Sequence, residues 1–290
     1  MSLPHVADIS EDVLTHADLR GASATDLRAA IRAGRYDGQT AGLAAGKLQC
    51  NLAILPAAHA LDFLRFCQRN PKPCPVVGIS DTGDPAMPTL GRDIDIRTDL
   101  PRYRVFRDGD LAEEVTDIIS HWGDDLVTVA LGCSFTFENA LVRAGIPVRH
   151  MERAQTVPMY RTAIPLVPAG PFHGTMVVTM RPIPADRVAD AHAISAAFPQ
   201  AHGAPVAKGD PAALGIADLE APEWGAPVDI RAGEVPVYWA CGVTPQNVLR
   251  AARLPLCLTH APGHMLVSDV AEDADTTILP PQEDQSGDFP

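Results

Sequence analysis

The sequence has no apolar run suited to a membrane span, and its first residues lack the pattern of a secretory signal, so we expect none. The one long stretch without charge, residues 162–180, contains three prolines and a histidine, which disfavours a membrane-spanning helix. Asp8, Glu11 and Asp12 occupy the region where a secretory signal needs positive charge and then an apolar segment. We therefore expect a cytoplasmic protein with no membrane partner.

Basic residues are in deficit, with 23 Lys and Arg against 36 Asp and Glu and a formal net charge of −13. Nucleic-acid binding depends on a basic surface that displaces counterions, so we exclude that class of partner. The segment after residue 270 is acidic and has almost no large apolar side chains, so it cannot offset its ordering entropy. We expect one catalytic unit over residues 1–270 and a disordered tail over 271–290.

The six cysteines form no CxxC pair and no spacing typical of zinc, so neither a structural metal nor disulfides are expected. Glycine-rich nucleotide loops, the G-x-S-x-G nucleophile motif and the H-E-x-x-H zinc motif are all missing. Nucleotide binding and the familiar hydrolase chemistries therefore have no support. We expect no cofactor and leave a divalent cation open.

Local patterns nevertheless predict several elements. Apolar periodicity, proline and glycine stops, and an Asp-Gly turn between alternating arms indicate helices over 24–33, 57–70 and 185–198, a buried strand over 174–180 and a hairpin over 102–115.

Two segments, 126–150 and 234–260, follow the same plan of an apolar strand, a glycine turn, a helix and a second apolar strand opened by proline. Their helices share the pattern Asn-x-Leu-x-x-Ala-x-x-Pro, beginning at Asn139 and Asn247, which indicates an internal duplication. Two βαβ-like units would pair their strands in parallel within each unit. The fold class is therefore α/β (mixed α+β), with two interwoven lobes and mixed sheets.

The starts of the two helices are informative. Gly132 and Gly242 form the turns, Ser134 is the expected N-cap of the first helix, and Thr244 followed by Pro245 predicts an N-cap with proline at N1. Free N–H groups and a partial positive charge at a helix start suit a carboxylate or a developing oxyanion. If both units face one cleft, they would suit a molecule with two carboxylates.

Four residues near these turns are candidates for catalysis. Cys133 precedes a helix start that can lower a thiol pKa, so it is either a nucleophile or a small residue that the turn requires. Glu138 is either an acid or an exposed first-turn glutamate. His260 and His264 are candidates for acid–base work, for metal binding together with Asp269, or for ordinary turn positions.

Two further residues are candidates for substrate binding. Arg161 lies between apolar residues and could bind a carboxylate through two hydrogen bonds or form an internal ion pair. His173 has a glycine on its C-terminal side, consistent with close approach of a ligand or with a turn.

Several stretches, taken together, resemble one family: QCNLAILP (49–56), DFLRFCQRNPKPCPV (62–76), RTDLPRYRVFRDG (97–109), GCSFTFE (132–138), VPMYRT (157–162), RPIP (181–184), GDPAALGI (209–216), VPVYWACGVTPQ (235–246) and THAPGHM (259–265). They are similar to the bacterial hydro-lyases related to the D-glutamate cyclase domain, over about residues 25 to 270. Cys50 stands where a small alanine is usual.

This resemblance implies a lyase that reversibly dehydrates D-glutamate to 5-oxo-D-proline. The turn at Gly132, Cys133 and Ser134 could hold an oxyanion, Arg161 could anchor the α-carboxylate, and a histidine could exchange protons. The alternative is a non-catalytic binding protein for a small carboxylate metabolite. Either way the partner is a small carboxylate, and self-association is left open.

Overall fold

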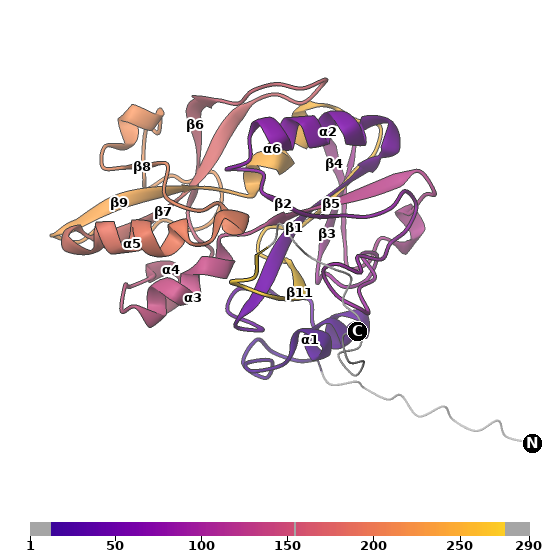
Figure 1. The fold of residues 1–290 in the computed structure, drawn as a ribbon, viewed down its shortest axis with the longest axis horizontal. Coiled ribbons are helices and arrows are strands. Elements are labelled where there is room, and N and C mark those ends of the chain that lie inside the picture. Colours follow the sequence, from indigo (N-terminus) through magenta and orange to yellow (C-terminus); the bar gives the residue numbers. More distant parts are fainter. Residues whose placement is uncertain (1–12, 154, 276–290) are drawn as a thin grey trace, which may run out of the picture.

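The structure is a computed structural model that describes residues 13–153 and 155–275. The larger of its two lobes holds a seven-stranded sheet in the order β2-β5-β1-β10-β3-β4, with β11 also paired to β1 (Figure 1). The strands of this sheet are β1 (Lys47–Pro56), β2 (Val76–Ile79), β3 (Tyr103–Arg107), β4 (Asp110–Val115), β5 (Leu126–Gly132), β10 (Cys257–His260) and β11 (Leu266–Ala271).

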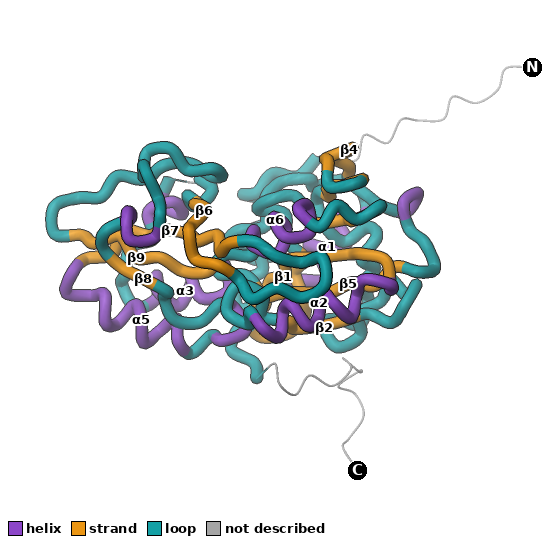
Figure 2. The backbone as a smooth tube through the Cα atoms, turned by 90° about the horizontal axis from the view of Figure 1, so that it is seen from above, coloured by secondary structure: helices purple, strands orange, loops and turns teal. Residues whose placement is uncertain are grey.

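The smaller lobe holds a four-stranded sheet in the order β6-β7-β9-β8, and the two lobes lie side by side (Figure 2). Its strands are β6 (Met159–Pro165), β7 (Thr175–Pro184), β8 (Ala207–Lys208) and β9 (Glu234–Ala240). The helices are α1 (Ala24–Arg32), α2 (Ala57–Arg69), α3 (Phe135–Arg143), α4 (Arg149–Glu152), α5 (Val188–Ala196) and α6 (Val243–Ala251). Short 3-10 turns cover Ile119–His121, Ala185–Arg187, Pro199–Ala201 and Pro211–Leu214. None of the helices in the described ranges is long and apolar enough to cross a bilayer.

The elements with strong local signals form at the predicted positions in the chain. Helices α1, α2 and α5 and strand β7 confirm four of the predicted elements. Ser23 caps α1 by accepting a hydrogen bond from the Asp26 backbone N–H at 3.1 Å. In the β3–β4 hairpin, Asp108 (φ 50°) and Gly109 (φ 84°) are both left-handed, as a two-residue turn of this kind requires.

Strand β1 is the centre of the larger sheet, although the patterns above did not identify it as an element. Its side chains alternate between the two faces, so that Leu52 and Ile54 belong to the apolar cluster on one face, while Ala53 and Leu55 pack on the other with α2. The same alternation places Asn51 on the face that carries α2. Asn51 lies at the junction between the lobes, where it lines the cavity beside both turns.

The predicted repeat is present as two strand–turn–helix segments, β5–α3 and β9–α6, but the predicted parallel pairing is wrong. Residues 144–148 form no second strand, and α4 begins at Arg149. Strand β10 follows α6 but lies in the other sheet from β9. Every pairing between the named strands is antiparallel. The mixed α/β class with two interwoven lobes is confirmed.

The pairing differs because each helix crosses to the opposite lobe instead of returning to its own sheet. Helix α3 follows a strand of the larger sheet, yet its Phe137 and Leu141 pack with Trp239 of the smaller sheet. Helix α6 follows a strand of the smaller sheet, yet its Val248 and Leu249 join the core of the larger lobe. This exchange brings both helix N-termini to the junction between the lobes.

The predicted tail lies mostly outside the described residues, which end at residue 275. Within the described part, Glu272 is buried and forms an ion pair of 2.8 Å with Arg143.

Candidate active site

A cavity of about 30 Å³, the inner cavity, lies where the two turns meet. Cys133 and Ser134 line it from the first turn, and Cys241 and Gly242 line it from the second. His260 lies in its wall as well. The predicted convergence of the two turns on one space is therefore confirmed, and that space is small.

The two turns have equivalent backbone geometry. The Val243 N–H donates to Cys241 Sγ at 3.5 Å, and the Phe135 N–H donates to Cys133 in the same way. The residue between, Ser134 in one turn and Gly242 in the other, has a backbone N–H with no hydrogen bond to any described residue. Two matching amide donors therefore remain unpaired beside one cavity, which is the arrangement that stabilises an oxyanion.

Asn51 holds the two turns together. Its side-chain Nδ2 donates to the Gly132 carbonyl at 2.9 Å, and a Cβ at Gly242 would lie 2.3 Å from the same nitrogen. A Cβ at Gly132 would lie 1.6 Å from the Gln200 carbonyl oxygen. Both glycines are therefore required by close packing. The sequence signal for Asn51 was a polar residue directly before the apolar run of residues 52–56.

A buried ion cluster lies beneath the first turn. Arg181 from β7 pairs with Glu138 from α3, and Arg181 also donates to Thr179 Oγ1 at 2.9 Å and to Ser134 Oγ at 3.2 Å. His150 Nε2 from α4 lies 3.0 Å from Glu138 Oε1. All five side chains are buried. The cluster fixes the start of α3 against the smaller sheet.

Glu138 differs from both expectations for it. It is only 2% exposed, so it is not a solvated first-turn glutamate. Burial alone would raise the pKa of its carboxyl, but the charges of His150 and Arg181 outweigh burial and lower the pKa to about 2. The expected acid with a raised pKa is therefore wrong, because the sequence does not show that Arg181 and His150 lie against this carboxyl.

The helix caps are also partly corrected. Ser134 occupies the N-cap position of α3, but its side chain makes no capping bond and accepts from Arg181 instead. Gly242, not Thr244, is the N-cap of α6. The Thr244 hydroxyl accepts from the Val177 N–H at 3.0 Å and donates to the Val177 carbonyl at 3.2 Å. It therefore joins α6 to β7 and does not face the inner cavity as a free donor.

The thiols beside the inner cavity are protonated at neutral pH. Burial is the main cause that raises the pKa of Cys133 to about 12 and of Cys241 to about 11. The expected lowering of the Cys133 pKa by the helix start is therefore wrong. Desolvation outweighs the hydrogen bond that the Phe135 N–H donates to this sulfur.

We predict that the native protein resists thiol reagents, because all six cysteines are buried and free and thiolates are the reactive species. Labelling with a chromogenic disulfide at neutral pH should be negligible until denaturant is added, when all six should react. Cys257, which is buried with a pKa raised to about 12, is the internal standard. If Cys133 reacts in the native protein while Cys257 does not, this description of Cys133 is wrong.

His260 and His264 differ in their surroundings. Burial lowers the pKa of His260 to about 3, and its Nδ1 accepts the Leu52 N–H at 3.1 Å. The imidazole is therefore neutral with its proton on Nε2, and the Gln246 amide, 2.9 Å from Nε2, must present its oxygen there. His264 is half-buried and does not line the inner cavity; its Nδ1 lies 2.9 Å from the Pro262 carbonyl oxygen.

The metal alternative for these histidines is contradicted. Asp269, the third ligand it requires, forms an ion pair of 2.8 Å with Arg28. Within residues 13–153 and 155–275, no group of three or more His, Cys, Asp or Glu side chains is placed to hold a metal ion.

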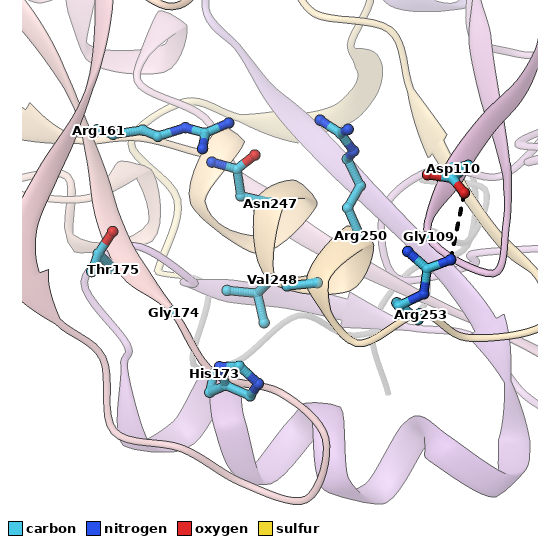
Figure 3. A pocket seen from close by; sticks show the side chains of 11 residues that line it. Gly109, Asp110, Arg161, His173, Gly174, Thr175, Asn247, Val248, Arg250 and Arg253 are labelled. Atoms are coloured by element: carbon cyan, nitrogen blue, oxygen red, sulfur yellow. Dashed lines mark hydrogen bonds and ion pairs between the residues drawn. The ribbon is translucent and has the colours of Figure 1, made fainter.

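Arg161 and His173 are brought together, but not at the inner cavity. Both line a separate cavity of about 360 Å³ between the β6–β7 hairpin and α6 (Figure 3). The Arg161 guanidinium lies 5.2 Å from the centre of the Trp224 ring and forms no ion pair within the described residues, so the alternative of an internal ion pair is wrong.

A larger pocket of about 720 Å³, the outer pocket, adjoins the inner cavity. Phe135, Thr156 and Val157 line both spaces. Arg20 and His150 also line the outer pocket. Sequence reasoning missed both residues, and it missed His150 because the chain around it was interpreted as a strand.

Comparison with known proteins decides the family. A protein named "Putative hydro-lyase" from Jannaschia sp. is 75% identical over 257 residues, 89% of this chain and 97% of that protein. Another of the same name from Dinoroseobacter shibae is 60% identical, covering 96% of this chain and 93% of its own. The D-glutamate cyclase family model matches residues 127–269. The chain belongs to this hydro-lyase family.

The part of this chain that the D-glutamate cyclase model matches begins in β5 and ends in β11. It therefore contains both turns, the ion cluster and His260, whereas Asn51 and Arg20 precede it. A solved structure, a nitrogen repressor-like protein from Methanococcus jannaschii, aligns over 81% of this chain and 90% of its own with 12% identity and a TM-score of 0.36, too weak a likeness to support an inference.

Proposed function

We propose that this hydro-lyase interconverts D-glutamate and 5-oxo-D-proline. In the forward direction the amine attacks the γ-carboxyl carbon, a C–N bond forms, a C–O bond breaks and water leaves. The observation that carries the proposal is the pair of unpaired backbone N–H groups, of Ser134 and Gly242, beside the inner cavity. Both can donate to the tetrahedral oxyanion, and each such donor contributes about 3–4 kcal/mol of barrier lowering.

The size of the inner cavity supports this role. A volume of about 30 Å³ exceeds the roughly 10–15 Å³ that one water molecule needs, so the cavity has room for a substrate oxygen and too little for the whole molecule. The rest of the substrate then lies in the outer pocket, whose volume of about 720 Å³ is ample. Phe135, Thr156 and Val157 form the passage between the two spaces.

His150 is the group best placed to move protons. Cyclisation transfers two protons from the nitrogen to the departing oxygen, so one imidazole can take a proton from the amine and return it to the hydroxyl. His150 lines the outer pocket beside the passage, and its Nε2 lies 3.0 Å from the Glu138 carboxylate. That carboxylate would stabilise the imidazolium, as in other paired carboxylate and histidine sites.

Arg20 is the candidate anchor for the α-carboxylate. Its side chain is exposed, lines the outer pocket and has no hydrogen bond or ion pair with the described residues. We predict that Arg20→Ala raises KM for D-glutamate about 10-fold or more while kcat changes little, because a charge-assisted pair contributes about 1.5–3 kcal/mol. Steady-state rates should show this split.

The matched control is Arg65→Ala on α2, which removes an exposed arginine outside the pocket. Equal KM values for the two variants would remove Arg20 from the substrate site.

One observation favours a different function, a non-catalytic carboxylate binder. The titratable groups that line the inner cavity are Cys133, Cys241 and His260, with pKa values of about 12, about 11 and about 3. None of these three groups changes its charge near neutral pH. Acid–base catalysis works best with a group whose pKa is near neutral, whereas simple binding of a carboxylate needs no such group.

Incubation of the purified protein with D-glutamate and, separately, with 5-oxo-D-proline decides between the two functions. Proton NMR follows both compounds, with and without a divalent cation, and the L-enantiomers serve as controls. We expect either compound to be converted to the same equilibrium mixture. If both compounds raise the unfolding temperature and neither is converted, the protein is a binder.

A further inference from the structure

The cavity that contains Arg161 and His173 lies between the lobes, beside the C-terminal half of α6 (Figure 3). Arg161 and Thr175 reach it from the smaller lobe, on β6 and β7, and Asn247 and Arg250 reach it from α6. The turn of the β3–β4 hairpin closes it from the larger lobe, with Gly109 in its wall. We call this cavity of about 360 Å³ the arginine pocket.

The arginine pocket gathers hydrogen-bond donors that have no partner. Among the described residues, no side chain or backbone group forms a hydrogen bond or ion pair with the side chains of Arg161, Thr175, Asn247 or Arg250. Most other arginines of this chain pair with a carboxylate. Arg161 and Arg250 have no such carboxylate among the described residues, and both line the same cavity of a chain with a net charge of −13.

Both guanidinium groups rest against aromatic rings. The Arg161 guanidinium carbon lies 5.2 Å from the centre of the Trp224 ring, and that of Arg250 lies 5.8 Å from the centre of the Phe106 ring. Stacking of this kind restricts the plane of the guanidinium and leaves its N–H edge free. In Figure 3 the guanidinium of Arg161 extends over α6 toward Asn247, and that of Arg250 rises from the helix on the same side.

Carboxylates near the pocket are too few to neutralise it. Asp110 lies 3.5 Å from Arg253, and it is 80% exposed. Glu223 accepts the backbone N–H of Arg161 at 3.1 Å. The guanidinium groups of Arg161, Arg250 and Arg253 outnumber these two carboxylates, so the pocket carries a net positive charge.

We propose that the arginine pocket binds the phosphate group of a small anion. A phosphate presents oxygens in several directions and can accept from two guanidinium groups on different elements together with the Asn247 amide and the Thr175 hydroxyl. A carboxylate is planar, and one guanidinium satisfies it. A volume of about 360 Å³ is enough for a phosphate or a small phosphorylated metabolite.

The proposed phosphate site is distinct from the inner cavity but shares a helix with it. Val243, the first residue of α6, lines the inner cavity. Asn247 and Arg250 of the same helix line the arginine pocket. A phosphate held by Arg161 and Arg250 would join β6 of one lobe to the helix that packs on the other. Binding should therefore raise the unfolding temperature of the whole protein.

Isothermal titration calorimetry with inorganic phosphate, at constant ionic strength, tests the site, and glycerol phosphate distinguishes free phosphate from a phosphomonoester. We expect one phosphate per chain. Arg161→Ala and Arg250→Ala should each weaken binding by about 10-fold or more. Arg231→Ala, which removes an exposed arginine outside the pocket, should leave the affinity unchanged. Asn247→Asp should also weaken binding, because it places a carboxylate among the donors without removing an arginine.

Two results would overturn the proposal. Phosphate affinity that is equal in the wild type and in both arginine variants would show that the pocket is not the site. Displacement of phosphate by D-glutamate, in a manner that requires Arg161, would show that the pocket binds the substrate instead. Failure of the proposed reaction would appear in the conversion assay and would leave the phosphate titration unaffected, so the two proposals fail separately.

Discussion

Replacing His150 with glutamine is expected to lower kcat for D-glutamate cyclisation by about 100-fold or more, the usual contribution of a positioned acid–base group. His150 lines the outer pocket, and its Nε2 lies 3.0 Å from the Glu138 carboxylate. Glutamine keeps a polar side chain of similar reach but cannot carry a proton between amine and hydroxyl. Initial rates at saturating substrate measure the effect.

The matched control is His16→Gln. His16 lines the same pocket, but its Nε2 lies 2.8 Å from the Ala41 carbonyl oxygen and no carboxylate of the described residues pairs with it. We expect this variant to retain most of its turnover. Substrate protection against thermal unfolding should persist in His150→Gln, since binding does not require proton transfer. Turnover close to that of the wild type in His150→Gln would assign the proton transfer to another group.

Arg181→Met is expected to lower the free energy of unfolding by about 3–5 kcal/mol, because it leaves a buried carboxylate without its arginine partner. Arg181 is fully buried and donates to Glu138, Ser134 and Thr179. Methionine fills much of the same volume but offers no charge and no donors. Urea unfolding at neutral pH measures the loss.

Two companion variants separate the ion pair from simple packing. Arg65→Met removes an exposed arginine paired with Asp62 at 2.9 Å, and we expect a loss of less than about 1 kcal/mol. Adding Glu138→Gln to Arg181→Met should recover part of the stability, because the uncompensated charge is then gone. If Arg181→Met and Arg65→Met lose equal amounts, the buried cluster has no special role in stability.

The same cluster predicts how acid acts on the protein. Folding depresses the Glu138 pKa from 4.5 to about 2. The stability that this group contributes is therefore fully present above the unfolded value of 4.5 and is lost as pH falls toward 2. Glu138→Gln should lack this part of the acid dependence when unfolding curves at neutral pH and at about pH 3 are compared.

Local signals in the sequence were sufficient for part of the fold. The Asp108-Gly109 turn, the glycine stop after α1 and the proline stop after α2 each depend on neighbouring residues, and the structure has all three. The crossing of α3 and α6 between lobes depends on contacts such as Phe137 with Trp239, about which a local pattern carries no information. The rule for parallel crossovers assumes that a helix returns to its own sheet, and here it does not.

The meeting of the two turns was predictable from the sequence, but the charge states of the groups around them were not. Glycine turns between an apolar strand and a helix placed Cys133, Ser134 and Gly242 together correctly. Whether burial or a neighbouring charge decides a pKa depends on residues distant in the chain. His150 and Arg181 together lower the pKa of Glu138, and Arg181 lies 43 residues from it in the chain. His150 gave no local signal.

The central position of β1 determines when the larger lobe can be completed during synthesis. This strand is made early, yet its partners are β5, β10 and β11, and the last of these ends at Ala271. Until the ribosome has released residues 257–271, one edge of β1 has no neighbour and could pair with another nascent chain. A chain that stops before β10 would keep that edge permanently, so early termination should yield aggregates and not a smaller folded protein.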